Sequence, residues 1–177
     1  MRLEIGSGYA PADGFDVHCD INPNCPHLEH VGPADSFPAE WADRFTEARA
    51  SDVLEHFSYM DTPRVLAEWR RVLAPGGRIY IQVPDAFRIV REGLAGRLPR
   101  PIELADDHHP DLRLSFWLLG GHGDGSRARA GDDWRWNAHY TAFSPDLLRW
   151  HLERAGFVVE SMGPLNLNIA CWARRVG

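Results

Sequence analysis

The sequence predicts an α/β fold of Rossmann-like type, in which a mostly parallel sheet carries helices on both faces and an antiparallel hairpin at one edge. Two observations lead to this class. Short apolar segments with strand periodicity alternate along the chain with helical segments that have distinct starts and stops. In addition, the first apolar segment ends in Gly6-Ser7-Gly8, the kind of turn at which such a sheet lets its backbone approach a nucleotide-type ligand.

Strands are expected at residues 3–5, 15–21, 50–54, 78–83, 157–161 and 167–173. The fourth shows the pattern most clearly, because Ile79, Ile81 and Val83 alternate with less apolar residues. Gly163-Pro164 separates the last two strands, and this predicts the antiparallel hairpin.

Two segments have the punctuation of helices. The first begins at Asp61 or Thr62, has Pro63 in its first turn, and stops at Pro75-Gly76-Gly77. The second begins at Ser144-Pro145 and ends at Gly156.

The N-terminal part of the fold is expected to be shortened. The first strand follows Met1 directly, so no helix is expected before it. The stretch from Gly8 to Asp20 is shorter than a usual parallel crossover, which takes about a dozen residues or more. The first helix is therefore expected to be very short or missing, leaving the backbone amides of the glycine loop to bind a ligand unaided.

Length predicts a single domain over residues 1–177. Residues 86–143 are interpreted as an insertion that covers the substrate, because their central part is rich in Gly, Pro, Asp and Arg. A loop of that length is more often functional than idle.

Composition excludes several classes of function. The net charge is −6 and the chain has no long arginine run, which argues against a nucleic-acid partner. No apolar run approaches the roughly 18 residues of a membrane span, and no signal peptide is recognisable. Cys19, Cys25 and Cys171 form no Cys-x-x-Cys pair, so a reducing cytoplasm is expected. All basic side chains are arginine, which favours a bacterium with GC-rich coding.

The residues that carry chemistry follow the strands in order. Asp20 ends the second strand, where an acidic side chain can accept hydrogen bonds from two ribose hydroxyls. Asp35 comes next, then Asp52-Val53-Leu54-Glu55-His56, and then the block from Arg71 to Ile81 that contains Pro75-Gly76-Gly77. With these blocks in this order, the sequence resembles the class I S-adenosylmethionine (SAM)-dependent methyltransferases, in a compact type 11-like form.

The resemblance implies SAM as cofactor, S-adenosylhomocysteine (SAH) as product, and a set of binding residues. Those facing the methionine end would be Glu4, Gly6 and Gly8, and Ser7 between the two glycines would also bind the cofactor. Asp20 would hold the ribose and Asp35 the adenine amino group, with Ile21 and Ser36 beside the adenine. The wall behind the sulfonium would be formed by Ser51, Asp52, Leu54 and His56. Alternatives stay open: Asp35 could cap a turn, Asp52 and Glu55 could be ordinary strand-end carboxylates, and His56 could orient or pack.

Candidates for proton removal from the acceptor lie in the insertion. His139, followed by His109, is the candidate catalytic base, because the pKa of histidine lies near working pH. The alternative is a polar loop whose histidines are hydrogen-bonded within the protein or face the solvent. Asp106-Asp107-His108-His109 could bind a metal, but adjacent residues rarely point at one ion, so no metal is predicted. Trp134 and Trp136 could stack on a ring or anchor the loop.

The function predicted is methyl transfer from SAM to a small molecule, with O-methylation favoured over N-methylation, as in the tailoring of a natural product or a sugar. The alternative is a non-catalytic partner or regulatory subunit of the same fold. A redox enzyme with a nucleotide cofactor is disfavoured, since the Pro-Gly-Gly and Leu-Glu-His segments would have no role in it. Cover for the substrate is expected from the insertion or from a partner subunit, for example in a homodimer.

Overall fold

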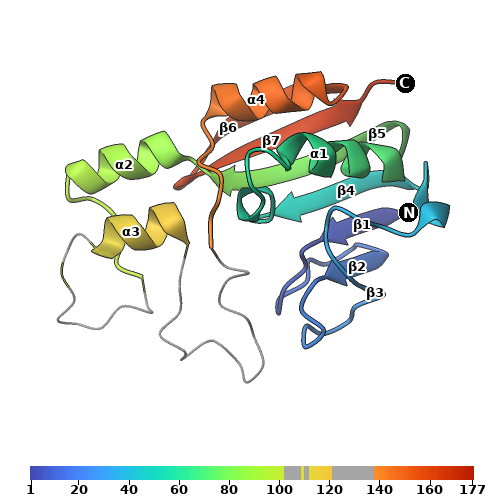
Figure 1. Ribbon diagram of the computed structural model, residues 1–177, viewed down its shortest axis with the longest axis horizontal. Coiled ribbons are helices and arrows are strands. Elements are labelled where there is room, and N and C mark those ends of the chain that lie inside the picture. Colours follow the sequence, from blue (N-terminus) through green and yellow to red (C-terminus); the bar gives the residue numbers. More distant parts are fainter. Residues whose placement is uncertain (102–108, 110–111, 121–137) are drawn as a thin grey trace.

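The computed structural model describes residues 1–101, 109, 112–120 and 138–177. Its centre is a seven-stranded sheet with the order β3-β2-β1-β4-β5-β7-β6 (Figure 1). The strands are β1 (Arg2–Ile5), β2 (Val17–Asp20), β3 (His30–Val31), β4 (Phe45–Ser51), β5 (Leu73–Pro84), β6 (Phe157–Leu165) and β7 (Asn168–Arg175). The first five pair in parallel, and β7 runs antiparallel to both β5 and β6. The predicted mostly parallel sheet with an antiparallel edge hairpin is confirmed.

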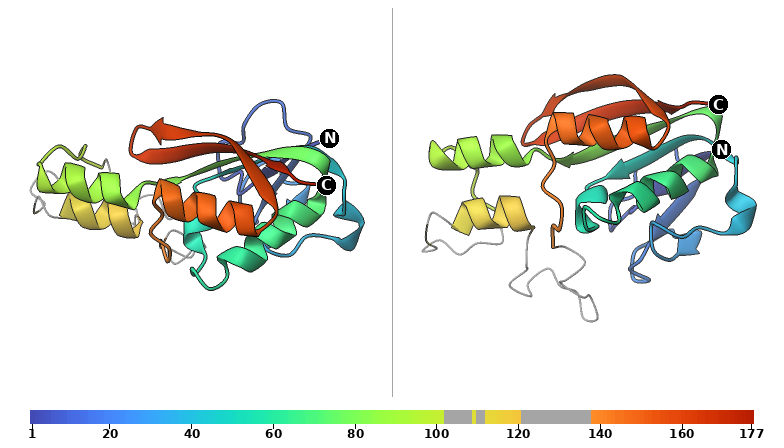
Figure 2. Two further views of the ribbon diagram at one scale, coloured as in Figure 1. Left: turned by 90° about the horizontal axis from the view of Figure 1, so that it is seen from above. Right: turned by 45° about the horizontal axis from the view of Figure 1, so that its top comes forward.

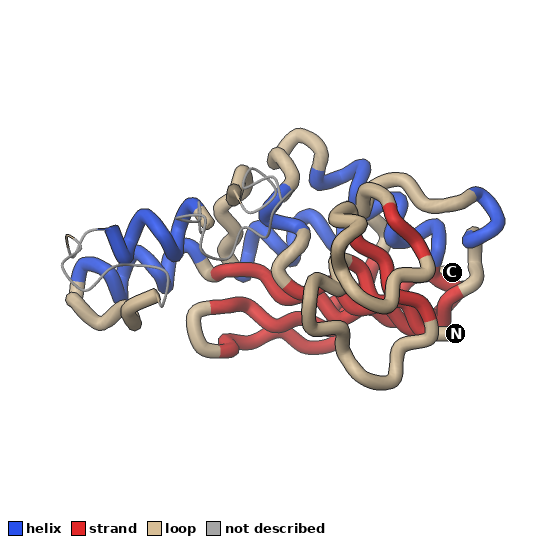
Figure 3. The backbone as a smooth tube through the Cα atoms, turned by 90° about the horizontal axis from the view of Figure 1, so that it is seen from below, coloured by secondary structure: helices blue, strands red, loops and turns tan. Residues whose placement is uncertain are grey.

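Helices cover one face of this sheet in the described part of the chain. The α-helices are α1 (Thr62–Val72), α2 (Ala86–Leu94), α3 (Leu112–Leu119) and α4 (Pro145–Arg154), and two short 3-10 turns are η1 (Ala39–Trp41) and η2 (Leu54–His56). Helices α1 and α4 lie side by side on the same face, whereas α2 and α3 pack together beyond the end of the sheet (Figures 2 and 3). The sequence predicted helices on both faces, whereas the described helices that lie over the sheet are on one face. On the other face the ring of Trp172 lies 5.4 Å from that of Tyr80 and under the guanidinium of Arg78.

Helix α1 forms where the sequence predicts it, because its apolar residues repeat on one side. Val65, Leu66, Trp69 and Val72 are fully buried against the sheet. The Trp69 indole also donates to the carbonyl of Ala34 at 2.7 Å, which fixes the segment after β3 over the helix. The core thus extends from the helix to the edge at which the predicted adenine residues lie.

Helix α4 begins and ends at the predicted residues. The Ser144 hydroxyl accepts a hydrogen bond from the Leu147 amide at 3.1 Å, and this satisfies one donor of the first turn. Gly156 follows the helix with φ of +83°, a conformation that glycine adopts without steric cost.

Several elements differ from the sequence prediction. Strand β5 begins at Leu73 instead of residue 78, so Pro75-Gly76-Gly77 lies inside this strand. The third predicted strand, at residues 50–54, lies earlier as β4, because Asp52 takes a left-handed φ of +57° and Leu54 continues into η2. The final hairpin turns at Asn166 rather than at Gly163-Pro164, since asparagine tolerates the left-handed φ of +53° found there. The two-residue strand β3 was not predicted at all.

The predicted shortening after the first strand is confirmed, because residues 6–16 contain no helix. Among the described residues, no helix combines the length and apolar character that crossing a membrane requires.

Candidate functional site

The predicted cofactor residues meet at one edge of the sheet. Because β1, β2, β3 and β4 are parallel, their carboxyl ends lie together, and the chain leaves them at Gly6, Asp20, Gly32 and Asp52. In open α/β sheets ligands bind at this edge. The sheet order, with β1 between β2 and β4, sets Gly6 between the other strand ends.

The glycine loop is held by β2 through its own backbone amides. The amides of Gly6 and Ser7 both donate to the carbonyl of Cys19, at 2.8 and 3.1 Å, and the Gly8 amide donates to Asp20 Oδ2 at 2.9 Å. The expectation that the loop amides bind the cofactor unaided is therefore wrong for these three. They serve instead to set the shape of the loop.

Gly6 cannot carry a side chain in this packing. Its φ is +67°, and a β-carbon placed on it would lie 2.4 Å from Cγ2 of Val53. Val53 precedes η2 on the neighbouring strand end, so the loop after β1 and the turn after β4 approach each other at this point. Sequence reasoning missed the contact because it depends on strand order.

Replacing Gly6 with alanine is expected to lower the free energy of unfolding by about 2–4 kcal/mol. About 1–2 kcal/mol comes from the left-handed backbone, and the rest from overpacking against Val53. Gly8→Ala is the matched control, because Gly8 has a φ of +58° but nothing within 4 Å of the added carbon. Urea unfolding measures both variants, and equal losses would contradict the steric role of Val53.

Asp20 sits at the end of β2 with its carboxylate fixed from two sides. Oδ2 accepts from the Gly8 amide at 2.9 Å and Oδ1 accepts from the Asn22 amide at 2.8 Å. A carboxylate has about four lone-pair sites, so each oxygen retains room for one further donor. The arrangement fits a ligand that brings two adjacent hydroxyls.

Glu4 lies beneath the loop rather than in open contact with a ligand. It is 1% exposed, and its carboxylate accepts from the guanidinium of Arg49, from His18 Nδ1 at 2.8 Å and from the Ala12 amide at 2.8 Å. Glu4 faces both His18 and Arg49 in the strand register. Its three donors make Glu4 an anchor for the far end of the glycine loop.

The predicted adenine residues lie after β2 and β3. Ile21 is exposed next to Asp20, and Ser36 is exposed as well. Asp35 forms an ion pair with Arg64 at 2.5 Å, and its side chain is only 14% exposed. The carboxylate of Asp35, which was predicted to bind the adenine amino group, therefore already has the Arg64 guanidinium as a partner.

The residues after β4 that were predicted to line the sulfonium differ in burial: some lie at the surface and Leu54 lies in the core. Asp52 Oδ2 accepts from the Ser51 hydroxyl at 3.2 Å and from the Gln82 amide group at 3.0 Å, while Oδ1 accepts from Asn168 at 3.2 Å. Leu54 is 1% exposed and belongs to the hydrophobic core, so its side chain supports the wall from behind.

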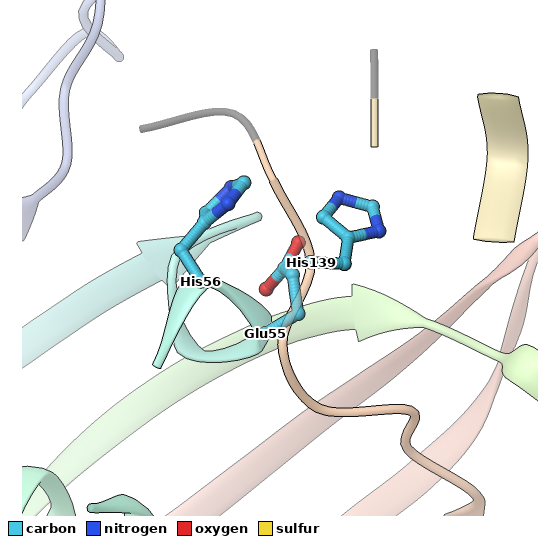
Figure 4. A group of neighbouring side chains, drawn as sticks. All are labelled: Glu55, His56 and His139. Carbon is cyan, nitrogen blue, oxygen red and sulfur yellow. The ribbon is translucent and has the colours of Figure 1, made fainter. Parts of the chain in front are cut away.

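Glu55, His56 and His139 meet beside this wall (Figure 4). Their potential ligand atoms all lie within 4.8 Å of one another, and the two imidazole centroids are 5.1 Å apart. Glu55 is 1% exposed, and neither carboxylate oxygen has a hydrogen-bond partner among the described residues. Burial, together with the nearby charge of Asp52, raises the pKa of Glu55 well above its usual value.

The tautomers of both histidines follow from their acceptors. His56 Nδ1 lies 3.0 Å from the carbonyl of Ala138, and His139 Nδ1 lies 3.3 Å from the carbonyl of Leu118. A carbonyl only accepts, so in the neutral rings Nδ1 carries the proton and the lone pair is on Nε2. Burial lowers the pKa of His56, which favours its neutral form.

The second candidate base, His109, lies apart from this group in the fold. It is exposed, and its carbonyl accepts from the amide of Leu112 at the start of α3. The other residues singled out in the insertion, Asp106, Asp107, His108, Trp134 and Trp136, fall outside the described part of the chain.

The edge has features that fit SAM. Ser7 Oγ is buried without a hydrogen-bond partner among the described residues, so a polar group of a ligand would satisfy it. Asp20 offers acceptors for a ribose, and the apolar side chain of Ile21 lies exposed next to it for a ring. The residues present therefore agree with the predicted cofactor.

Comparisons with known proteins agree with this reading. A family described as "Methyltransferase domain" matches residues 7–162. A search of the curated proteins by sequence finds no match. Among solved structures, Burkholderia thailandensis 1,6-didemethyltoxoflavin-N1-methyltransferase, with bound 1,6-didemethyltoxoflavin and SAH, is similar with a TM-score of 0.63 and 14% identity, over 99% of this chain and 71% of that one.

Two further structures show the same fold. A putative SAM-dependent methyltransferase from Listeria monocytogenes has a TM-score of 0.63 and 13% identity, over 99% of this chain and 91% of that one. A putative methyltransferase from Haloferax volcanii, in complex with the Trm112 methyltransferase activator, has a TM-score of 0.61 and 14% identity, over 99% of this chain and 82% of that one.

Proposed function

The chain belongs to the methyltransferase domain family and is an enzyme of the SAM-dependent type, and we propose that it methylates a small-molecule acceptor, on oxygen in preference to nitrogen. The observation that carries the cofactor site is Asp20, whose carboxylate is fixed by the amides of Gly8 and Asn22 and faces the edge at which strands β1 to β4 end. A natural product or a sugar is the proposed class of acceptor.

In this proposal Asp20 accepts the two ribose hydroxyls and Ile21 packs against the adenine. Ser7 Oγ is offered to the methionine end, and Glu4 holds the loop through the Ala12 amide. Asp35 receives the adenine amino group while keeping Arg64 as a second partner. The space near the sulfonium is then enclosed by Ser51, Asp52, His56 and the backbone of Leu54.

The net charge of the chain and the elements beyond the sheet end favour a small molecule. The net charge of −6 would repel nucleic acid, and α2, α3 and the segment from residue 138 project beyond the sheet end where an acceptor would enter. The Burkholderia neighbour has 1,6-didemethyltoxoflavin bound, which supports a small molecule as the acceptor. Because that neighbour is an N-methyltransferase, nitrogen stays the alternative acceptor atom in our proposal. We place the protein in the cytoplasm.

His139 is the proposed base for a hydroxyl acceptor, with His109 as the second candidate. The segment that carries His139 is fixed to η2, because the amides of Tyr140 and Thr141 both donate to the carbonyl of Glu55, at 2.8 and 3.2 Å. The hydroxyl of Thr141 donates to the carbonyl of Phe57 at 2.7 Å. A base held this firmly can remove a proton while oxygen, methyl carbon and sulfur stay in line.

A second candidate is a role with a partner chain. The Haloferax neighbour was solved in complex with an activator, and the sheet of the present chain has one face without described helices. A homodimer or a regulatory partner would then close the site or cover that face.

The proposal is tested by incubating the protein with SAM and a panel of small hydroxyl and amine compounds. We expect SAH to accumulate and one hydroxyl compound to gain a methyl group, as measured by mass spectrometry. Methylation confined to amines would overturn the oxygen preference. Binding of SAH without turnover of any compound would favour the non-catalytic role.

A further inference from the structure

We propose that Glu55, His56 and His139 bind one divalent transition-metal ion such as Zn²⁺, and that this ion holds the oxygen of the methyl acceptor. Figure 4 shows the carboxylate of Glu55 between the two imidazoles. Two histidines and one glutamate are a ligand set that proteins use for catalytic zinc and for other first-row divalent ions. The sequence predicted no metal, since it offered only the adjacent residues 106–109 as ligands. The group of Glu55, His56 and His139 joins residues far apart in the chain.

The buried carboxylate is the first reason. Glu55 is 1% exposed, and neither of its oxygens finds a donor in the described part of the chain. A buried carboxylate without a partner is costly, so either a proton or a cation must neutralise it.

The orientation of the histidines is the second reason. Each ring donates Nδ1–H to a backbone carbonyl, Ala138 for His56 and Leu118 for His139. Metal-bound histidines characteristically donate their other ring N–H to such an acceptor, which fixes the ring and leaves the second nitrogen for the ion. The described contacts therefore orient Nδ1 of each ring toward a backbone acceptor, as in histidines that bind a metal through Nε2.

The distances allow the site to close around an ion. The three ligand atoms lie within 4.8 Å of one another, and bonds of about 2.1 Å in a tetrahedral site place ligands about 3.4 Å apart. Closing around an ion shortens these separations by at most about 1.4 Å. The backbone next to His139 is already held in place, since the amides of Tyr140 and Thr141 donate to the carbonyl of Glu55 and the hydroxyl of Thr141 donates to that of Phe57.

Three protein ligands leave at least one coordination position open. A hydroxyl bound there would lose its proton to water more readily, and its oxygen would attack the methyl carbon. The O–CH₃ bond forms as the CH₃–S bond breaks, and the sulfur keeps the bonding pair as the neutral thioether of SAH. This step rests on the proposed function, whereas ion binding does not, because it is measured without substrate. With the ion bound, His139 acts as its ligand and not as the base.

The test uses the full chain after treatment with a chelator. Titration with Zn²⁺ by calorimetry is expected to show one ion per chain, and Glu55→Gln and His139→Gln are each expected to weaken binding at least about 100-fold. His27→Asn is the control, because His27 is exposed and its φ of +61° suits asparagine. Co²⁺ absorption distinguishes nitrogen and oxygen ligands from the three cysteine thiols.

Thermal unfolding shows whether the variants are folded. Zn²⁺ should raise the Tm of the parent protein and of His27→Asn but not that of Glu55→Gln, whose side chain is of the same size. Absence of stoichiometric binding to the parent, equal binding by Glu55→Gln, or a cobalt–thiolate band would each overturn the site. SAH titration on the same samples separates these outcomes from failure of the cofactor site.

Discussion

Replacing Asp20 with alanine is expected to weaken the binding of SAH at least about 100-fold. Hydrogen bonds to a charged group contribute about 1.5–3 kcal/mol each, and the proposed site uses two of them for the ribose. The variant also releases the amides of Gly8 and Asn22, which Asp20 holds in place on either side of its carboxylate. Isothermal titration calorimetry measures the change directly.

Asp16→Ala is the matched control for Asp20→Ala. Asp16 also accepts a backbone amide, that of Arg2 at 2.7 Å, but it precedes β2 and lies at the opposite end of that strand from Asp20. Its replacement should leave SAH affinity within twofold, an order-of-magnitude expectation for a surface site. An unchanged affinity in Asp20→Ala would overturn the placement of the ribose.

Replacing His139 with glutamine is expected to lower kcat by roughly 10²–10⁴-fold, the usual contribution of a positioned acid or base. Loss of an ion that activates the hydroxyl would change kcat in the same direction. SAH affinity should stay near that of the parent, because His139 faces Glu55 and His56 and not Asp20 or the glycine loop. Steady-state kinetics at saturating SAM, with an acceptor found in the panel, make the measurement.

His109→Gln distinguishes the two candidate histidines. The exposed His109 lies outside the group around Glu55, so its replacement should change kcat little. If kcat falls with His109→Gln and not with His139→Gln, the base lies at the start of α3 and the assignment of His139 is wrong. The zinc titration then shows independently whether His139 is a ligand.

Much of the fold could be predicted because its signals are local. The buried stripe of α1, the Ser144 cap and Gly156 are read within one helix, and each forms as predicted. β4 was misplaced because Ala48 and Ala50 give a weak strand pattern, whereas Val53-Leu54 gives a strong one. Only the left-handed turn at Asp52 ends the strand before them.

The cofactor edge was predictable in outline and not in detail. Gly6, Asp20 and Asp52 each follow a strand, and parallel strands bring their ends together. The partners of Glu4 could not be read from the chain, since His18 and Arg49 face it only through the pairing of β1 with β2 and β4. Strand order also decides that Val53 packs on Gly6.

The family, the parallel sheet with its edge hairpin and the strand-end residues that we propose bind SAM could all be inferred from the sequence. These depend on short-range periodicity and on turns that only a few residues can form. The tertiary structure alone decided that His139 meets Glu55 and His56, that the loop amides bind β2, and that α1 and α4 share one face. Such contacts join residues distant in sequence, and their free energy comes from packing and hydrogen bonds that exist only once the sheet has formed.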